Sequence, residues 1–405
     1  MAAMEALRTL AVLLAAGSLV AVAARRLRVP DVALFLLAGV ALGPAALGWV
    51  RVPAAGGMNA FVLLLGASWL LFEGGMALRF AVLRRIWITV ALLSTLGVAI
   101  TAAITGAAAQ RLLGLPWAVA LLLGAVLAPT DPATLVPVFR QVRIRERVTQ
   151  AAISESACND ATGAILALAL LGIAQGGVAP DAAALLGGFA RQAGLGMVVG
   201  IVLGGGACWL VARRQRALLA DFAAPVLLAG VAGAYVLAEQ LHASGFMAVF
   251  VLGLVFGNQA AFGFAMEPQA RQRFDDFAGI ASLVLRLLIF MLLGTQVDFA
   301  LLGRYALPAA AVVAIFMLLA RPVAVAACAA PDRRARWSVR ELLFLCWTRE
   351  TGVIPAALAG LLGASGAPGA DVILAVTFAA ILATLLIQAT TTRALAQRLG
   401  LLEGA

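Results

Sequence analysis

Residues 117–139 have the sequence WAVALLLGAVLAPTDPATLVPVF, an apolar stretch that contains one carboxylate and three prolines. Its length suits a membrane crossing, which takes about 20 apolar residues in a helix. Proline removes a backbone donor and clashes with the preceding turn, so we expect this helix to break near Thr130. Asp131 before Pro132 is typical of an N-cap followed by proline at the first helical position. We therefore predict a second half-helix that begins at mid-membrane, with Asp131 at its positive end.

The rest of the chain has the composition of a membrane protein. Of its 405 residues, 64% are hydrophobic and 12% are charged, and the mean hydropathy is +1.05. A soluble domain is about 45–50% apolar and about 25% charged, so a soluble fold is excluded. The first apolar run ends at Arg25 and Arg26 without a small-residue cleavage site, and we expect it to be a retained helix.

Arginine, proline and glycine clusters divide the chain into apolar spans. The division predicts an all-α membrane protein with thirteen transmembrane helices. The spans are roughly 6–24, 31–48, 58–77, 86–109, 116–139, 149–175, 182–212, 221–241, 243–260, 276–297, 300–329, 339–364 and 370–396.

The arginines test this division independently. All 29 basic residues are arginine; 21 follow odd-numbered spans, five lie on the opposite side of the membrane and three lie inside spans. Because cytoplasmic loops are enriched in arginine, we place the N-terminus outside and the C-terminus in the cytoplasm, and the chain in the cell inner membrane. The net charge of +10 does not indicate a nucleic-acid partner, since the arginines are scattered between apolar runs.

A second interruption lies in the twelfth span, where Thr348-Arg349-Glu350-Thr351-Gly352 precedes Pro355. The two breaks fall seven spans apart, an odd number, so the units around them have opposite orientations. We predict two inverted six-helix repeats, spans 1–6 and 8–13, with span 7 as connector. Interrupted helices at matching positions of inverted repeats indicate a transporter's binding site. Two ordinary proline kinks are the alternative, although kinks seldom carry flanking charges.

The sixth span carries Glu155, Ser156, Asn159 and Asp160 within two helical turns. Two carboxylates this close cannot both stay charged in hydrocarbon unless each has its own partner. We pair Glu155 with Arg349, the arginine beside the second break. Asp160 then has no permanent counter-ion, so a proton and a metal cation can compete for its oxygens. A buried, protonated Asp160 that only holds helices together is the structural alternative.

Oxygen ligands suit a hard monovalent cation. Beside Asp160 we expect the Ser156 hydroxyl, the hydroxyl or carbonyl of Thr130, and Glu73 from the third span. Four other residues are better explained by structural roles: Glu239 and Arg286 as lone charges, Arg321 as a snorkelling side chain, and His242 as a turn residue.

Several motifs together resemble the monovalent cation/proton antiporter superfamily, in the branch of electroneutral sodium/proton exchangers. They are Leu71-Phe72-Glu73-Gly74-Gly75, Ala128-Pro129-Thr130-Asp131-Pro132, Glu155-Ser156-Ala157-Cys158-Asn159-Asp160, the stretch from His242 to Phe250, and Ala320-Arg321-Pro322.

The resemblance implies an elevator mechanism in a homodimer, with the broken helices crossing in a mobile core. The core would be about 86–175 and 300–396, the dimerising scaffold about 6–77 and 221–297, and the connector 182–212. It implies that Asp160 binds the ion with help from Ser156, Thr130, Glu73 and Asn159, and that Glu155 and Arg349 form an ion pair. Asn159 in place of a second aspartate implies one-for-one exchange.

One departure from the family lies at Glu350, because the family commonly has Leu-Arg-Gly where this chain has Thr-Arg-Glu-Thr-Gly. Glu350 is thus a candidate modulator of the ion pair or of cation preference. We expect Na+ as the transported ion, no cofactor and no cytosolic regulatory domain. K+/H+ exchange by the same architecture is the alternative. An intramembrane aspartyl hydrolase using Asp131 and Asp160, and an anion carrier, are less favoured: the hydrolase lacks a catalytic motif, and the mid-membrane clusters are acidic.

Overall fold

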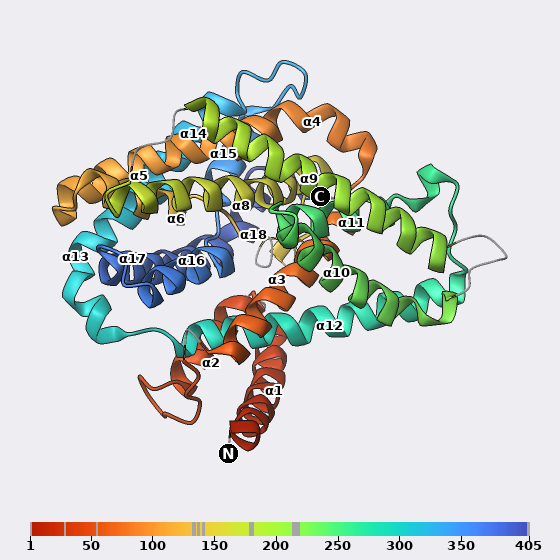
Figure 1. Ribbon diagram of the computed structural model, residues 1–405, viewed down its shortest axis with the longest axis horizontal. Coiled ribbons are helices and arrows are strands. Elements are labelled where there is room, and N and C mark those ends of the chain that lie inside the picture. Colours follow the sequence, from red (N-terminus) through yellow and green to blue (C-terminus); the bar gives the residue numbers. More distant parts are fainter. Residues whose placement is uncertain are drawn as a thin grey trace.

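The computed structural model describes residues 2–27, 30–53, 56–131, 135, 138–139, 142–177, 182–212 and 219–402 (Figure 1). Most of these residues are helical, and the part of the chain described contains no strand beyond an isolated bridge between Ile144 and Leu402. The α-helices are α1 (Ala2–Leu27), α2 (Asp31–Leu42), α3 (Gly57–Met76), α4 (Phe80–Leu92), α5 (Val98–Leu113), α6 (Trp117–Leu127), α8 (Glu146–Ala174), α9 (Ala182–Val211), α10 (Ala223–Gln240), α11 (Gly245–Gly257), α12 (Pro268–Thr295), α13 (Phe299–Ile315), α14 (Arg321–Cys328), α15 (Val339–Trp347), α16 (Val353–Ala364), α17 (Ala370–Ala383) and α18 (Thr390–Arg398).

Three π-helical segments join consecutive α-helices into longer ones. They are η1 (Leu93–Gly97) between α4 and α5, η4 (Phe316–Ala320) between α13 and α14, and η5 (Thr384–Ala389) between α17 and α18. Two short 3-10 segments, η2 (Ala220–Phe222) and η3 (Gln259–Phe262), precede α10 and follow α11. π-Helical turns inside α-helices frequently lie at functional sites.

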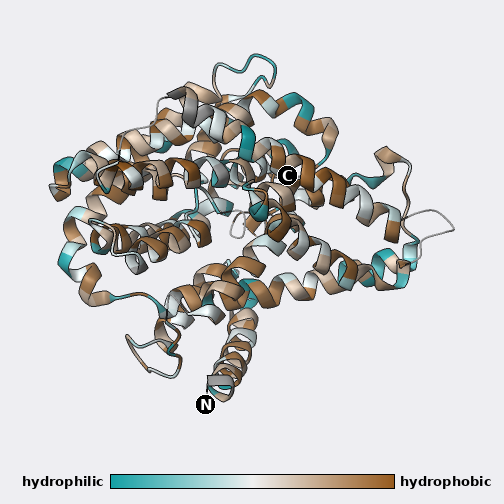
Figure 2. Ribbon diagram, in the orientation of Figure 1, coloured by the Kyte–Doolittle hydropathy of each residue, from teal (hydrophilic) through white to brown (hydrophobic). Residues whose placement is uncertain are grey.

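Length and hydropathy identify a multi-pass membrane protein. Among the described residues, nine helices are long and apolar enough to cross a membrane, and four apolar helices are shorter. Each of these overlaps one of the predicted spans; the number of crossings and the inverted repeats stay predictions. Figure 2 shows hydrophobic residues over most of the helical length, with hydrophilic residues concentrated in loops and at helix ends. The shorter helices are Asp31–Leu42, Trp117–Leu127, Gly245–Gly257 and Val353–Gly363.

The helices pack around separate apolar clusters. One cluster draws mainly on α5, α6, α13 and α17; another draws mainly on α1, α2, α3 and α12 and also includes residues of α16 and α17. In Figure 1 the first group lies on the left, α12 runs along the lower side, and α9, α10 and α11 lie to the right. The division into core, scaffold and connector remains a prediction.

Glycines bring some helix pairs unusually close together. A Cβ built on Gly39 of α2 would lie 2.1 Å from the Met291 carbonyl oxygen of α12. A Cβ on Gly294 of α12 would lie 2.2 Å from the Leu36 carbonyl oxygen of α2. Small residues at such positions let membrane helices pack backbone against backbone, where lipid offers no hydrophobic driving force. The α2–α12 pair is therefore a tightly packed part of the molecule.

Candidate functional site

The first break lies where the prolines predict it. Helix α6 ends at Leu127, and Thr130 and Asp131 are not helical. The Leu135 backbone N–H donates to the Asp131 carbonyl 3.2 Å away, which is the hydrogen bond of a renewed helical turn. Pro132 and Pro137 lie outside the described residues, so the capping role of Asp131 stays a prediction.

The second break meets the first. Helix α15 ends at Trp347 and α16 begins at Val353, with non-helical residues between them. The Asp131 N–H donates to the Glu350 carbonyl at 2.9 Å. A Cβ built on Gly352 would lie 1.8 Å from Asp131 Oδ2, so a side chain at this position would displace the Asp131 side chain. One carbonyl of the second unwound segment thus satisfies a backbone N–H of the first, as buried irregular backbone requires.

Helix α8 holds the first unwound segment through Thr130. The Ser156 hydroxyl donates to the Thr130 carbonyl at 2.8 Å. The Asn159 side chain accepts from the Thr130 N–H at 3.2 Å and donates to the Thr130 hydroxyl at 2.9 Å. The structure therefore brings together Thr130, Ser156 and Asn159, three of the proposed ligand residues; Ser156 and Asn159 lie on α8 within about one helical turn of Asp160.

Asp160 lies on the same helix as Ser156 and Asn159, but its side chain has no hydrogen-bond partner among the described residues. Its side chain is buried, and neither carboxyl oxygen has a hydrogen-bond partner among the described residues. The carboxylate of Asp131 lies close enough to act on it electrostatically. A buried charge without a partner is costly, so this carboxyl has to be neutralised by something that binds to it. Asp160 is thus chemically suited to hold either a proton or a metal cation.

The ion pair of Glu155 differs from our prediction. Arg321, not Arg349, binds the Glu155 carboxylate with two guanidinium nitrogens, and the Arg321 Nη2–Glu155 Oε2 distance is 3.0 Å. Arg349 instead donates to the Ala128 carbonyl and lies over the ring of Phe316, 4.8 Å from its centroid. The predicted contact between Glu155 and Arg349 is therefore wrong, as is the snorkelling role of Arg321, which is fully buried.

The physical reason for this error lies in helix phase. Arg321 follows directly after the π-helical segment η4. Such a segment adds a residue to one turn, so the side chains after it point about 100° away from their places in an uninterrupted α-helix. A fork of parallel N–H donors then faces the carboxylate, an arrangement that arginine supplies and that is strong when buried.

The π-helical segments η4 and η5 each place a side chain against the second unwound segment, and η1 places one against α8. Ser94 of η1 donates to the Glu155 carbonyl at 3.3 Å. The ring of Phe316 in η4 packs against the Arg349 guanidinium. The Thr384 hydroxyl of η5 accepts from the Thr351 N–H at 3.1 Å. Sequence reasoning missed these residues, because an isolated Ser, Thr or Phe in an apolar span gives no signal of its own.

Glu73 and Glu350 are two further buried carboxylates near the crossing, and their surroundings differ. Glu73 is buried near the end of α3, which packs against α8 and α16. Its role as a ligand remains a prediction. Glu350 is completely buried, and neither of its carboxyl oxygens has a hydrogen-bond partner among the described residues. Asp131 acts electrostatically on Glu350 as it does on Asp160, so the residue that departs from the family pattern belongs to the crossing itself.

The remaining intramembrane charges have local partners. Arg286 of α12 donates to Asp31 of α2 at 2.8 Å, a pair that the sequence did not identify. Glu239 accepts from the Gly245 N–H at 3.1 Å across the turn between α10 and α11. His242 occupies that turn with a φ of 54°, as a turn residue can. These contacts fit the structural roles expected for Glu239, Arg286 and His242.

Comparison with known proteins shows the family. Residues 10–398 match the family described as sodium/hydrogen exchanger, transmembrane. The chain is 31% identical to a K(+)/H(+) antiporter NhaP of Alkalimonas amylolytica over 370 residues, which are 90% of this chain and 61% of that protein. It is 30% identical to Na(+)/H(+) antiporter 1 of Methanocaldococcus jannaschii over 91% of this chain and 85% of that protein. The chain thus spans less than two thirds of the first relative and most of the second.

A solved structure agrees with these sequence matches. The sodium proton antiporter MjNhaP1 from Methanocaldococcus jannaschii at pH 8 superimposes with a TM-score of 0.79 and 28% sequence identity, covering 98% of this chain and 99% of that chain. The named relatives are transporters and not enzymes. The chain therefore belongs to the transmembrane sodium/hydrogen exchanger family, within the monovalent cation/proton antiporter superfamily.

Proposed function

We propose that this protein exchanges a monovalent cation, Na+ in the first instance, for protons across the cell inner membrane, with Asp160 as the shared binding site. The observation that carries the proposal is the Asp160 carboxyl, which is buried and has two oxygens without a hydrogen-bond partner among the described residues. Two residues on the same helix, Ser156 and Asn159, fix the polar groups of Thr130 in the first unwound segment.

The coupling follows from the energy of a buried charge. An ionised carboxylate at mid-bilayer costs about 2.5–3.5 kcal/mol on insertion scales, so the empty, charged form of Asp160 is disfavoured. A proton removes the charge, and a cation compensates it through the same oxygens. Only one of the two can occupy the site, and each leaves when the other arrives. This competition is sufficient for obligatory exchange.

The cation would be held by oxygen atoms from both broken and continuous helices. Asp160 supplies the charge, and Ser156 keeps lone pairs free while its proton is donated to the Thr130 carbonyl. Thr130, Asn159 and Glu73 complete the proposed set, Asp131 supplies charge at the half-helix, and Glu350 tunes the balance. With Asn159 neutral, one proton is exchanged for one cation and the cycle moves no net charge.

Na+ is the first choice of ion, and K+ is the alternative. The relatives named above include one K(+)/H(+) antiporter and one Na(+)/H(+) antiporter, at 31% and 30% identity. The solved structure with a TM-score of 0.79 is that of a sodium proton antiporter. Both ions are hard cations that take oxygen ligands, so the proposed chemistry serves either.

We also propose an elevator movement in a homodimer, with the core about 86–175 and 300–396 moving against the scaffold about 6–77 and 221–297. Thirteen spans in two inverted repeats would carry it, with the N-terminus outside and the C-terminus cytoplasmic. The closely packed pair α2 and α12 supports a rigid scaffold.

The test is transport by the purified protein in liposomes that contain a pH-sensitive dye. Addition of Na+, Li+ or K+ outside should move protons, and the order of the rates ranks the ions. Asp160→Asn should abolish exchange, whereas Asp275→Asn, which removes a carboxylate on the exposed end of α12, should leave it intact. Exchange that survives Asp160→Asn sinks the proposed site, and a rate that responds to membrane voltage sinks electroneutrality.

A further inference from the structure

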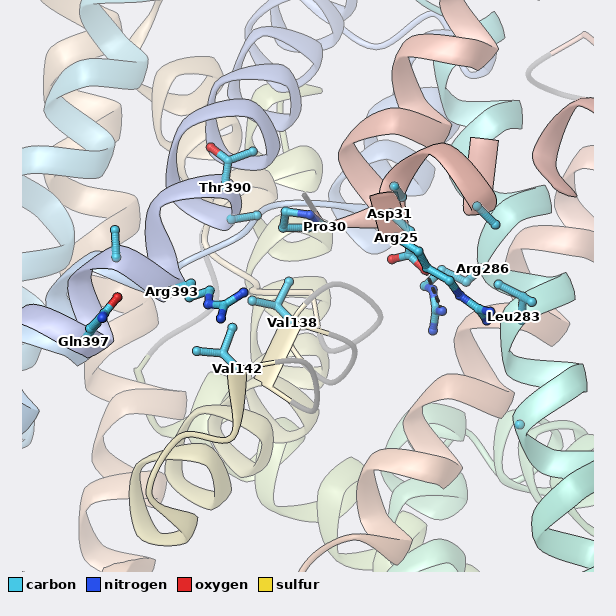
Figure 3. Close-up of a pocket in the computed structure, with 15 residues that line it drawn as sticks. Arg25, Pro30, Asp31, Val138, Val142, Leu283, Arg286, Thr390, Arg393 and Gln397 are labelled. Atoms are coloured by element: carbon cyan, nitrogen blue, oxygen red, sulfur yellow. Dashed lines mark hydrogen bonds and ion pairs between the residues drawn. The ribbon is translucent and has the colours of Figure 1, made fainter. Parts of the chain in front are cut away.

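A cavity of about 690 Å³ lies between the proposed scaffold and core, and Asp160 is not among the residues that line it (Figure 3). One wall comes from α1, the start of α2, and α12, which belong to the proposed scaffold. The other wall comes from Val138, Val142 and helix α18, which belong to the proposed core. The volume falls in the range of about 300–1,000 Å³ that is usual for ligand pockets.

The charges on these walls are mostly positive. Three arginines, Arg25, Arg286 and Arg393, line the cavity together with a single carboxylate, that of Asp31. Figure 3 shows Arg25 beside Asp31 and Arg286 on the scaffold wall, and Arg393 on the opposite wall. A metal cation would be repelled by this excess of positive charge, whereas an anion would be attracted.

The hydrogen-bonding capacity of the arginines is largely unused within the described residues. Arg286 pairs with Asp31 through Nη2, but its buried Nε has no hydrogen-bond partner there. Arg25 and Arg393 have exposed side chains, and neither forms an ion pair with a described residue. Asp31 Oδ1 is also buried without a hydrogen-bond partner among the described residues. The scaffold wall therefore has one unpaired carboxylate oxygen and a larger number of unpaired guanidinium N–H donors.

We propose that this cavity binds a phosphate-bearing anion, either the headgroup of an anionic phospholipid or a soluble phosphate compound. Guanidinium groups match phosphate oxygens in bidentate geometry, and basic pockets between transmembrane helices on the cytoplasmic side bind lipid headgroups. The arginine distribution places Arg25 and Arg393 on that side. The amide of Gln397 adds a neutral donor on the α18 wall.

A bound anion would contact both walls at once. In an elevator mechanism the two walls move relative to each other, so an occupant that binds one arrangement stabilises it. We therefore expect the anion to slow exchange. This regulatory part rests on the proposed function, whereas the binding itself does not.

The binding test measures thermal unfolding of the purified full chain in detergent. The lipid probe is phosphatidylglycerol, with diacylglycerol as the matched lipid without phosphate. The soluble probe is pyrophosphate, with sodium chloride at equal ionic strength as its control. A rise in Tm with phosphatidylglycerol alone identifies the lipid as the source, and a rise with pyrophosphate identifies a soluble anion. The binding proposal is wrong if neither probe raises Tm above its control.

Variants separate the cavity from general surface charge. Arg393→Gln and Arg25→Gln should each raise the concentration for half-maximal stabilisation about tenfold, as expected for one lost charge-assisted hydrogen bond. Arg398→Gln should leave it unchanged, because Arg398 is exposed on the same helix but does not line the cavity. Equal losses in Arg393→Gln and Arg398→Gln would overturn the assignment.

Transport then tests the regulatory part. In liposomes, the effective anion should slow exchange by the unaltered protein more than by Arg393→Gln. If the anion binds but exchange is equal in both, the cavity is a binding site without control over transport, and the regulatory part is wrong. If no ion is exchanged in any liposome, the proposed function fails while the Tm result still decides the binding site.

Discussion

Arg321 binds Glu155 through two guanidinium nitrogens, and both side chains are buried inside the helix group that carries the two breaks. The guanidinium Nε also donates to the Leu345 carbonyl at 2.8 Å, which ties α14 and α15 to α8. Arg349, the neighbour of the second break, is engaged elsewhere. Because Glu155 is paired with Arg321, Arg349 and Glu350 are charges at the crossing that do not belong to this ion pair.

Arg321→Gln should destabilise the protein strongly, because it leaves the Glu155 carboxylate buried without its partner. Breaking a buried pair from one side costs about 3–5 kcal/mol, whereas removing both charges costs much less. The double variant Glu155→Gln/Arg321→Gln should therefore unfold at a higher temperature than Arg321→Gln in detergent. Compensation of Glu155→Gln by Arg349→Gln instead would contradict the pairing seen here.

Asn159→Leu should release the first unwound segment, because Thr130 loses both the acceptor and the donor that Asn159 provides. A buried N–H left without a partner costs about 1–3 kcal/mol. We expect a lower Tm and a fall in the exchange rate of more than about tenfold, since that cost corresponds to about one to two powers of ten. Liposome transport and thermal unfolding measure the two effects.

Asn159→Asp complements Asn159→Leu, because it tests the effect of an added carboxyl group while the contacts to Thr130 are kept. A carboxylate can accept from both the Thr130 N–H and the Thr130 hydroxyl, which rotates to donate. This variant should therefore retain Thr130 in place. Its added carboxyl can also take up a proton, so exchange should become voltage-sensitive. A rate that remains independent of voltage in Asn159→Asp would show that Asn159 does not set the stoichiometry.

Gly352→Ala should prevent the two unwound segments from crossing, because the new Cβ would lie 1.8 Å from Asp131 Oδ2. Overpacking of this kind costs about 1–3 kcal/mol, and here it also displaces the crossing beside Asp160. We expect exchange to be lost and Tm to fall. Gly360→Ala on the same helix has no atom within 4 Å of its new Cβ and serves as the control. Equal activity of the two variants would refute the close crossing.

Asp332, in the loop between α14 and α15, gives a pH-dependent prediction. Burial alone would raise the pKa of this carboxyl, but hydrogen bonds from the Thr89 side chain and from the Ala335, Arg334 and Thr89 backbone lower it below its ordinary value of 3.8. A lowered pKa in the folded protein means that the charged form stabilises the fold at neutral pH. That stabilisation is lost as the pH falls below about 4, through the folded-state pKa.

Asp332→Asn should accordingly lower Tm at pH 7, because a neutral amide replaces a carboxylate that accepts from Thr89 Oγ1 at 2.6 Å. The difference in Tm from the unaltered protein should stay constant down to about pH 4 and shrink below it, as the pH falls through the lowered folded-state pKa of Asp332. Thr89 also accepts from Trp337 Nε1 at 2.8 Å, so tryptophan fluorescence can follow the same loop. A difference that stays constant below about pH 4 as well would contradict the role of the charge.

The sequence by itself determined the class of the protein, the positions of its apolar helices and the places where two of them break. These are local properties: the length of an apolar run decides whether a helix can cross the bilayer, and proline or glycine decides where its backbone hydrogen bonds stop. Asp160 was identifiable for the same reason, since a carboxylate in such a run is costly wherever the helix packs.

The partners of the buried charges were decided only by the tertiary structure. Glu155 pairs with Arg321 and Arg286 with Asp31, across sequence separations of 166 and 255 residues. Two π-helical segments, η4 and η5, cannot be read from the hydrophobic pattern, and they place Phe316 and Thr384 against the crossing. Side-chain direction after such a segment depends on one added residue in a turn, and that residue is selected by packing against other helices, not by its neighbours in the chain.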